Sequence, residues 1–263
     1  MIRVHVVGTM DLNQRFWEVD SVRGIAIVMM IAYHSLFDLS YFNVLDLDVT
    51  SGLFWYFARI TAATFIFLVG VSLKLSHSRA EKLNLYSSDR EFFMKYLKRG
   101  LKIFAWGLGI TVMTWIFIRA DFIMFGVLHF IGVAIILSYP FLKRRYTNLV
   151  VGILCLAAGI YLQTVYFDFS WFMWLGFVPS TIHTVDYFPL LPWLGVVLLG
   201  TFAGEVLYRG YRRNFHLPDL SRTCPVRMTG VLGRHSLLIY LVHQPILILI
   251  LYFIGVLQVG SLF

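Results

Sequence analysis

Apolar residues are grouped along the chain in long runs that short polar segments separate. A transmembrane helix needs about 20 consecutive, mostly apolar residues. Seven runs come close to that length, at residues 24–44, 53–73, 101–118, 123–142, 147–166, 188–207 and 236–257. The pattern predicts an all-α, polytopic membrane helix bundle of about seven transmembrane helices, which forms a single domain over residues 1–263.

Two further segments are rich in apolar residues without being predicted spans. The segment from Phe169 to Pro179 contains several Trp and Phe residues, and its shortness favours an interfacial or re-entrant piece. The connection from Ser76 to Lys98 is expected to carry an amphipathic helix on the cytoplasmic side, because apolar side chains alternate with charges between residues 92 and 97.

Positive charge alternates from one connection to the next. All but two of the 22 Lys and Arg residues lie in residues 1–23, 74–102, 143–145 and 209–234. The positive-inside rule assigns these segments to the cytoplasm, so an odd number of spans makes the N-terminus cytoplasmic and the C-terminus extracytoplasmic. The orientation also accounts for the net charge of +8, and no nucleic acid is expected as a partner.

The composition is typical of a protein embedded in the lipid bilayer, since 59% of the 263 residues are hydrophobic and only 14% are charged. No cleavable signal peptide is evident, because the first apolar run is too long for a signal sequence. Small size and the lack of targeting signals favour the plasma membrane of a prokaryote. The sequence leaves open whether the protein is a monomer or a homodimer.

The first apolar run contains two ionisable residues, Arg23 and His34. Eleven helical positions turn through about 1100° and rise about 16.5 Å, so both side chains are expected on one face, Arg23 at the membrane edge and His34 near its middle. Ionisable groups within a span are costly and are candidates for function. Asp38 lies one turn beyond His34, where a carboxylate can orient an imidazole. Alternatively, a neighbouring helix satisfies His34, and Arg23 anchors the span or pairs with Asp20.

Five other polar residues near predicted helix ends are candidates for the same site: His129, His243, Gln244, Arg59 and Asp186. Each has a structural alternative. The first two side chains of the sequence His-Gln-Pro can satisfy the carbonyl that Pro245 leaves without a donor. Asp186 can cap the helix that begins near Tyr187, and Arg59 can pair with a carboxylate in a loop.

No metal is expected, because the histidines lack the i, i+4 pairing of a metal site and no Cys lies nearby. Four glycines are interpreted as points of close helix packing: Gly24, Gly70, Gly126 and Gly195. The basic stretches at residues 95–100 and 209–213 either set the orientation of the protein or bind phosphate groups.

Several motifs resemble known acyltransferases. Arg23, ten further residues and then His34 resemble the signature of the acyltransferase-3 type. A closer resemblance is to the heparan-alpha-glucosaminide N-acetyltransferase catalytic-domain family. The motifs that carry it are VDSVRGIA at 19–26, HSLFDL at 34–39, FIFLVGVSL at 65–73, GVLHFIGV at 126–133, DYFPLLPW at 186–193, LGRHSL at 232–237 and YLVHQP at 240–245.

The resemblance implies an enzyme that takes acetyl-CoA from the cytoplasm and passes the acetyl group to a sugar amine or hydroxyl on the far side. The chain differs from the animal enzyme, which has asparagine at the position of His34 and its proposed active-site histidine in the following loop. That loop, residues 40–54, contains no histidine here. Either His34 takes the whole acid–base role or the acceptor differs.

Together these observations give a mechanistic hypothesis. The phosphates of CoA bind Arg23, Lys98 and Arg99. His34, oriented by Asp38, acts as general base, and His129 or His243 stabilises the oxyanion. The acceptor is held by Arg59, Asp186 and Gln244. Direct transfer is preferred, with an acetyl-histidine intermediate as the other route. The rival functions are a proton-coupled solute transporter and a non-catalytic protein whose histidines only join helices.

Overall fold

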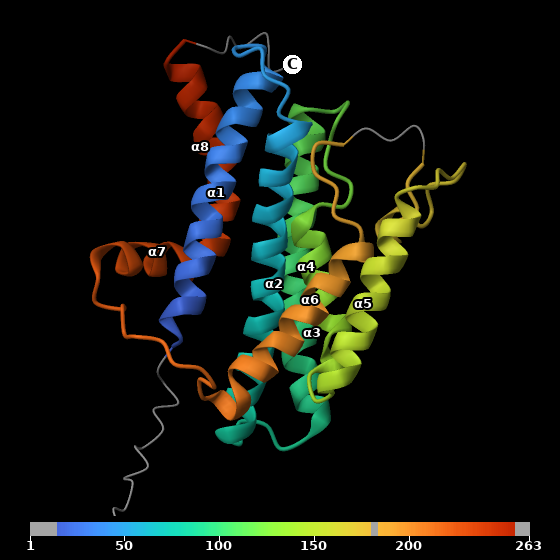
Figure 1. The fold of residues 1–263 in the computed structure, drawn as a ribbon. Coiled ribbons are helices and arrows are strands. Elements are labelled where there is room, and N and C mark those ends of the chain that lie inside the picture. The colour runs from blue at the N-terminus through green and yellow to red at the C-terminus, as the bar shows by residue number, and fades with distance from the viewer. Residues whose placement is uncertain (1–14, 180–183, 256–263) are drawn as a thin grey trace, which may run out of the picture.

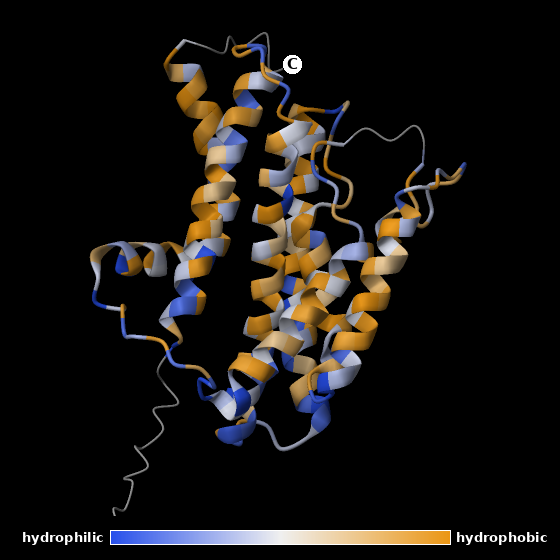
Figure 2. Cartoon of the chain, viewed as in Figure 1, coloured by the Kyte–Doolittle hydropathy of each residue, from blue (hydrophilic) through white to orange (hydrophobic). Residues whose placement is uncertain are grey.

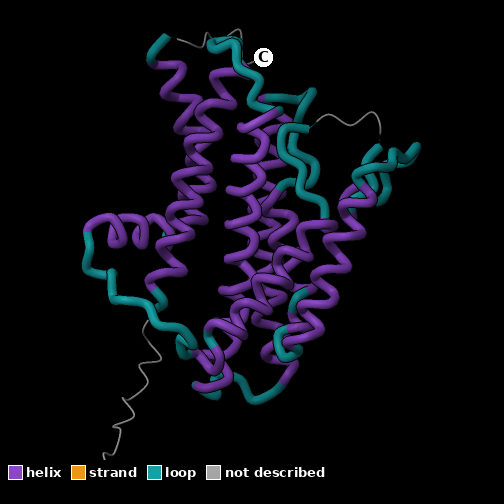
Figure 3. The backbone as a smooth tube through the Cα atoms, viewed as in Figure 1, coloured by secondary structure: helices purple, strands orange, loops and turns teal. Residues whose placement is uncertain are grey.

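The computed structural model describes residues 15–179 and 184–255, and these form helices joined by loops (Figures 1 and 3). The α-helices are α1 (Trp17–Tyr41), α2 (Gly52–Lys82), α3 (Asp89–Phe117), α4 (Val127–Leu137), α5 (Arg145–Leu162), α6 (Leu190–Leu207), α7 (Cys224–Arg234) and α8 (Ser236–Phe253). Short 3-10 helices lie at Tyr139–Phe141, Met173–Leu175 and Arg209–Tyr211. The predicted all-α fold is confirmed.

Six helices within the described ranges are long and apolar enough to cross a membrane, namely α1, α2, α3, α5, α6 with its 3-10 extension, and α8. The seventh predicted span, residues 123–142, contains only the 11 residues of α4, which ends before Pro140. Proline lacks the amide proton that would continue the helix, and a 3-10 turn follows instead. The prediction of about seven spans was therefore close, and the orientation of the termini stays a prediction. The end of the last predicted span, residues 256–257, lies outside the described residues.

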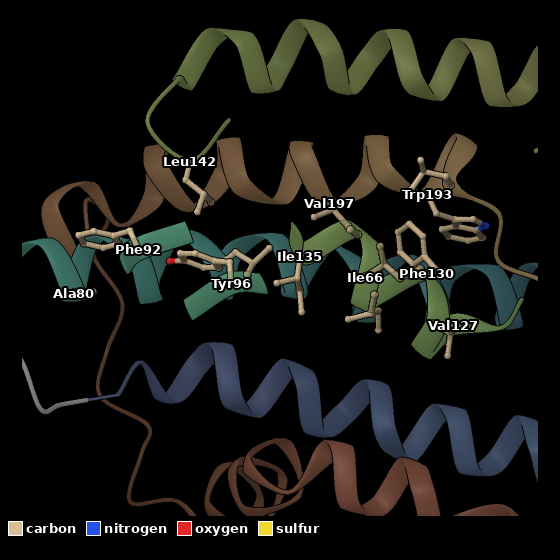
Figure 4. Close-up of a cluster of buried hydrophobic side chains, with 14 residues drawn as sticks. Ile66, Ala80, Phe92, Tyr96, Val127, Phe130, Ile135, Leu142, Trp193 and Val197 are labelled. Carbon is tan, nitrogen blue, oxygen red and sulfur yellow. The ribbon is translucent and has the colours of Figure 1, made fainter. Parts of the chain in front are cut away.

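The helices pack around α2 (Figure 1). On one side α2 contacts α1, and α1 contacts α7 and α8; on the other side α2 contacts α6, which carries α5. Helix α4 packs on α3 and brings Phe130 and Ile135 against Ile66 of α2 and Val197 of α6 (Figure 4). This apolar cluster is the main core of the bundle.

Close helix crossings depend on glycine. A Cβ atom at Gly24 would lie 1.9 Å from the carbonyl oxygen of Thr229, and one at Gly233 would lie 1.8 Å from that of Asp20, so α1 and α7 touch through their backbones. A Cβ at Gly70 would lie 2.0 Å from the carbonyl oxygen of Val197 in the crossing of α2 with α6. Glycine permits such approach because it has no side chain to clash. The predicted packing role is confirmed for Gly24, Gly70 and Gly195, the last against the backbone of Gly152 in α5. Gly126 differs, because it precedes α4 and a Cβ there would meet the side chains of Asp186 and Ile123 rather than a neighbouring helix.

Polar residues gather where α1 begins, α2 ends and α3 begins, at the foot of the bundle in Figure 2. We call this the basic end. The separate amphipathic helix expected at residues 76–98 is wrong, because α2 and α3 themselves continue into this region and leave only residues 83–88 as a connection. Phe92 and Tyr96 are buried against the core, which explains the amphipathic pattern. A short amphipathic helix instead occurs as α7, which lies across the foot of α1 (Figure 1).

The aromatic segment from Phe169 to Pro179 contains one 3-10 turn and no helix of spanning length. Its rings contact one another, as between Phe169 and Phe172, while the side chain of Trp171 is 81% exposed. The segment therefore does not span, as expected, and its location at the membrane interface stays a prediction.

Candidate active site

A cavity of about 580 Å³ opens between α1, α2, α3, α4 and the start of α8. Its described lining contains one carboxylate, that of Asp20, and seven cationic side chains: Arg15, Arg23, Arg79, Lys95, Arg99, Lys102 and Arg234. A cavity lined by charges of one sign concentrates ligands of the opposite sign. The size falls within the usual range for small-ligand and cofactor pockets. An anionic ligand therefore fits this cavity.

The charged lining is confined to the mouth, and the deeper walls are apolar. Phe65 and Val69 of α2 face Val127 and Leu128 of α4 there, and Tyr240 of α8 lines the same region. On α2 the lining extends from residue 65 to residue 80, a rise of about 22 Å along the helix. The cavity thus suits a long ligand with an anionic end and a thinner, less polar arm.

Arg23 connects three parts of the bundle at the cavity wall. Its guanidinium donates to Asp20 Oδ1 (3.0 Å) and to Ser72 Oγ of α2 (2.5 Å). It also approaches the carbonyl oxygen of Gly233 at the end of α7, at 3.5 Å. The predicted pairing with Asp20 is confirmed. The contact with Ser72, which sequence spacing does not indicate, holds α1 against α2 beside the cavity.

Lys98 and Arg99 were expected to act together, but only Arg99 lines the cavity. Lys98 is exposed and outside the lining. Successive helical positions are rotated by about 100°, so neighbours in sequence face different directions. The residues that share the face of Arg99 are Lys95 and Lys102, at spacings of four and three. That periodicity was the signal that could have identified the remaining cations on α3.

Two histidines meet at the contact of α1 with α8. The rings of His34 and His243 lie at right angles with their centroids 4.9 Å apart. Nδ1 of His34 lies 2.9 Å from the carbonyl oxygen of Met30, and Nδ1 of His243 lies 2.6 Å from that of Tyr240. Because a carbonyl oxygen only accepts, the hydrogen bonds assign a proton to each Nδ1 and leave each Nε2 as an acceptor. Nε2 of His243 is buried and has no partner among the described residues.

Asp38 and Gln244 join the same two helices one turn further along. Asp38 is 2% exposed, and its Oδ1 accepts a hydrogen bond of 2.5 Å from Nε2 of Gln244. The expected hydrogen bond from His34 to Asp38 is not present, because the imidazole donates to its own helix at Met30 while the carboxylate faces α8. The carbonyl that Pro245 leaves without a donor is that of Leu241, and His243 bonds instead to Tyr240.

Three acceptors in this cluster have no donor within the described part of the chain. They are Asp38 Oδ2, Gln244 Oε1 and His243 Nε2, and all three are buried. Leaving a buried polar atom unpaired typically costs about 1–3 kcal/mol, so such atoms usually have a bound partner. A group that carries N–H or O–H donors is the partner that would satisfy them.

His129 has a different environment. Its Nδ1 accepts from the backbone N–H of Gly126 at 3.3 Å, and its Nε2 lies 3.4 Å from Thr111 Oγ1, which itself donates to the carbonyl of Ile123. Both ring nitrogens are therefore occupied at the start of α4. The structure does not bring His129 into the contact of His34 with His243.

Asp186 lies at the same turn. Its Oδ2 accepts a hydrogen bond from the backbone N–H of Val127 at 3.1 Å, so Asp186 caps α4. The sequence had suggested that it caps the helix near Tyr187 instead. The reason for the difference is that residues 184–188 run alongside residues 121–125, with Phe188 N–H donating to the carbonyl of Phe125 at 3.0 Å. Burial raises the pKa of Asp186 to about 6.

Arg59 of α2 is exposed, and its guanidinium lies over the rings of Trp55 and Trp193, 5.1 and 5.7 Å from their centroids. These aromatic partners replace the loop carboxylate considered from the sequence. As for a metal, residues 15–179 and 184–255 contain no group of three His, Cys, Asp or Glu that could hold one.

Comparisons with known proteins address the identity of this bundle. The family described as "Heparan-alpha-glucosaminide N-acetyltransferase, catalytic" matches residues 15–245. Neither the curated proteins nor the solved structures gave a significant match. The matched stretch contains the whole cavity lining and both histidines, and with six apolar helices it indicates a multi-pass membrane acyltransferase. Because the match covers most of the chain, the protein belongs to the heparan-alpha-glucosaminide N-acetyltransferase catalytic family.

Proposed function

We propose that the protein transfers the acetyl group of acetyl-CoA, bound from the basic end, to an amine or hydroxyl of a sugar or glycoconjugate that arrives from the opposite side of the membrane. The observation that carries this proposal is the cavity, which has seven cations in its lining and also includes Tyr240, whose ring contacts that of His243 in the histidine pair. Membership of an acetyltransferase family supports the reaction class.

The donor occupies the cavity with its phosphates among the cations at the mouth. Arg and Lys form strong charge-assisted hydrogen bonds to phosphate, and Arg does so with two donors at once. Arg23 and Arg99, which were expected to bind the donor, belong to this set, as does Lys95 of the basic stretch at residues 95–100. The other four cations, which the sequence did not single out, are Arg15, Arg79, Lys102 and Arg234. The pantetheine arm then follows the apolar wall of α2 and α4, and the thioester reaches the region of Tyr240.

The histidine pair provides the base. Tyr240 lines the cavity, its ring centroid lies 5.5 Å from that of His243, and His243 in turn contacts His34. His34 accepts the proton of the incoming acceptor at Nε2 and becomes positively charged. The adjacent His243, whose Nε2 is an unprotonated acceptor, stabilises this positive charge. The unpaired oxygens of Asp38 and Gln244 accept hydrogen bonds from the incoming amine or hydroxyl.

The reaction is a direct substitution at the thioester carbon. The acceptor nitrogen or oxygen attacks this carbon, the new C–N or C–O bond forms, and the C–S bond breaks. The proton of the acceptor goes to the imidazole and from there to the departing thiolate, so CoA leaves as the thiol. The alternative route through an acetyl-histidine uses the same residues in two steps.

The test uses purified protein in proteoliposomes with radiolabelled acetyl-CoA supplied on one side and amino sugars or polyols on the other. We expect transfer by the wild type and loss of transfer by His34→Ala, with acetyl-CoA still raising the melting temperature of both proteins. Wild-type turnover by a folded His34→Ala variant would refute the role of His34. Absence of any effect of acetyl-CoA on wild-type stability, combined with solute-dependent proton flux, would instead support a transporter.

A further inference from the structure

Tyr240 occupies the position where three features of the site meet. Its side chain lines the deep part of the basic cavity, and it lies beside His129, Asp186 and Gly126. Its ring lies 5.5 Å from that of His243, and its backbone carbonyl holds Nδ1 of His243 at 2.6 Å. Among the described residues, Tyr240 is therefore the side chain that connects the cavity with both the Asp186 region and the histidine pair.

The phenol of Tyr240 retains a free donor. No hydrogen bond to its hydroxyl is present within the described part of the chain, and the side chain is half-buried in the lining of the cavity. Other half-buried tyrosines donate to a protein acceptor, such as Tyr33 to the carbonyl of Val49 and Tyr187 to that of Met173. A tyrosine hydroxyl inside a protein usually finds a partner, so a ligand group that accepts a hydrogen bond is expected at this point.

The cavity brings such a group to Tyr240. The cations fix the anionic end of a ligand at the mouth, and the walls of Val127 and Leu128 at the deep end cannot donate hydrogen bonds. If the ligand is acetyl-CoA, as under the proposed function on which this inference rests, the group at the deep end is the thioester. Its carbonyl oxygen is an acceptor without another donor from those walls.

We propose that Tyr240 is a catalytic residue whose phenol O–H donates a hydrogen bond to the thioester carbonyl oxygen and to the oxyanion that forms from it. When the acceptor attacks the carbonyl carbon, the electron pair of the C=O bond moves onto this oxygen. The pair returns as the C–S bond breaks. The phenol keeps its proton throughout, and the proton of the acceptor goes to the histidine pair and then to the thiolate.

The test compares Tyr240→Phe with Tyr33→Phe. Both substitutions remove one hydroxyl and keep the ring, but the hydroxyl of Tyr33 is already bonded to the backbone. Loss of one oxyanion donor typically lowers kcat by about 10²–10³-fold. We expect this loss for Tyr240→Phe with the KM for acetyl-CoA within about twofold of the wild type, and a kcat close to the wild-type value for Tyr33→Phe. Equal kcat values for Tyr240→Phe and the wild type would overturn the assignment.

A second measurement does not depend on the folding of a variant. The infrared frequency of the carbonyl in bound, ¹³C-labelled acetyl-CoA falls when that oxygen accepts a hydrogen bond. We expect a lower frequency on the wild-type protein than in an apolar solvent, and a return toward the apolar value in Tyr240→Phe. An apolar-like frequency on the wild type would refute the hydrogen bond while leaving acetyl-CoA binding intact. Failure of the wild type to bind or use acetyl-CoA would instead refute the proposed function itself.

Discussion

Two histidine clusters in this bundle differ in what they leave available. At the start of α4, His129 uses both ring nitrogens, and the carboxylate of Asp186 caps the same turn. At the contact of α1 with α8, His34 and His243 each donate Nδ1–H to a backbone carbonyl and keep Nε2 without a protein partner in the described residues. The first arrangement stabilises a helix end, whereas the second leaves acceptors for a reacting group. Burial alone would not separate them.

The largest expected effect comes from the α1–α8 cluster. His34→Ala and His243→Ala should each lower kcat for acetyl transfer by about 10²–10⁴-fold, because general-base catalysis contributes in that range. The double variant should lose little more than either single variant, since the two rings act as one unit. Radiolabel transfer by protein whose melting temperature shows it to be folded is the measurement. If the loss in the double variant equalled the sum of the two single losses in activation free energy, the two histidines would act independently.

The donor site offers a matched pair of neighbours. Arg99→Ala should raise the KM for acetyl-CoA about 10- to 100-fold, since a hydrogen bond between charged groups is worth about 1.5–3 kcal/mol. Lys98→Ala removes an equal charge that lies outside the cavity and should leave the KM within about twofold. Steady-state kinetics with varied acetyl-CoA decide the matter. Equal effects of the two changes would mean that the protein attracts CoA only through its overall charge.

The α4 cluster should respond in stability rather than in chemistry. His129→Ala removes an acceptor at a helix start, and loss of a cap typically costs about 0.5–2 kcal/mol. We expect a lower melting temperature and, for the folded fraction, a kcat within a few fold of the wild type. Thermal unfolding and transfer assays on the same preparation test this. A drop in kcat as large as that of His34→Ala would return His129 to the catalytic group.

The smallest expected effect is the contribution of Asp186 to the pH dependence of stability. Its folded pKa of about 6 exceeds the usual value of 3.8, so the folded state binds the proton more tightly and stability falls as pH rises through this window. Asp186→Asn keeps an acceptor for Val127 but cannot ionise. Relative to this variant, the wild type should lose roughly 1 kcal/mol of stability between pH 4 and pH 7, because partial exposure reduces the full effect of the shift. The measurement is the melting temperature of both proteins from pH 4 to pH 7. The same pH dependence in the wild type and in Asp186→Asn would contradict the raised pKa of Asp186.

The sequence predicted the spans well because long apolar runs identify themselves by length, and it identified Arg23 and the histidines because charges within such runs stand out. It could not predict partners between helices. Asp38 was matched with His34 from its spacing on one helix, yet its hydrogen bond goes to Gln244, 206 positions away. The length of α4 was also missed, since Pro140 ends a helix within an otherwise continuous apolar run.

The contacts of α8 have a practical consequence for handling the protein. Helix α8 packs mainly on α1 and α7, whereas most of the cavity lining lies on α2, α3 and α4. Under the proposed function, the histidines and the thioester therefore approach each other across the α1–α2 contact. A detergent that loosens the contact between α1 and α2 would abolish acetyl transfer by the purified protein, while circular dichroism would still report the native helix content. Reconstitution into lipid before the assay should restore turnover. Recovered turnover would show that the inactive protein had lost the contact between α1 and α2 and had not unfolded.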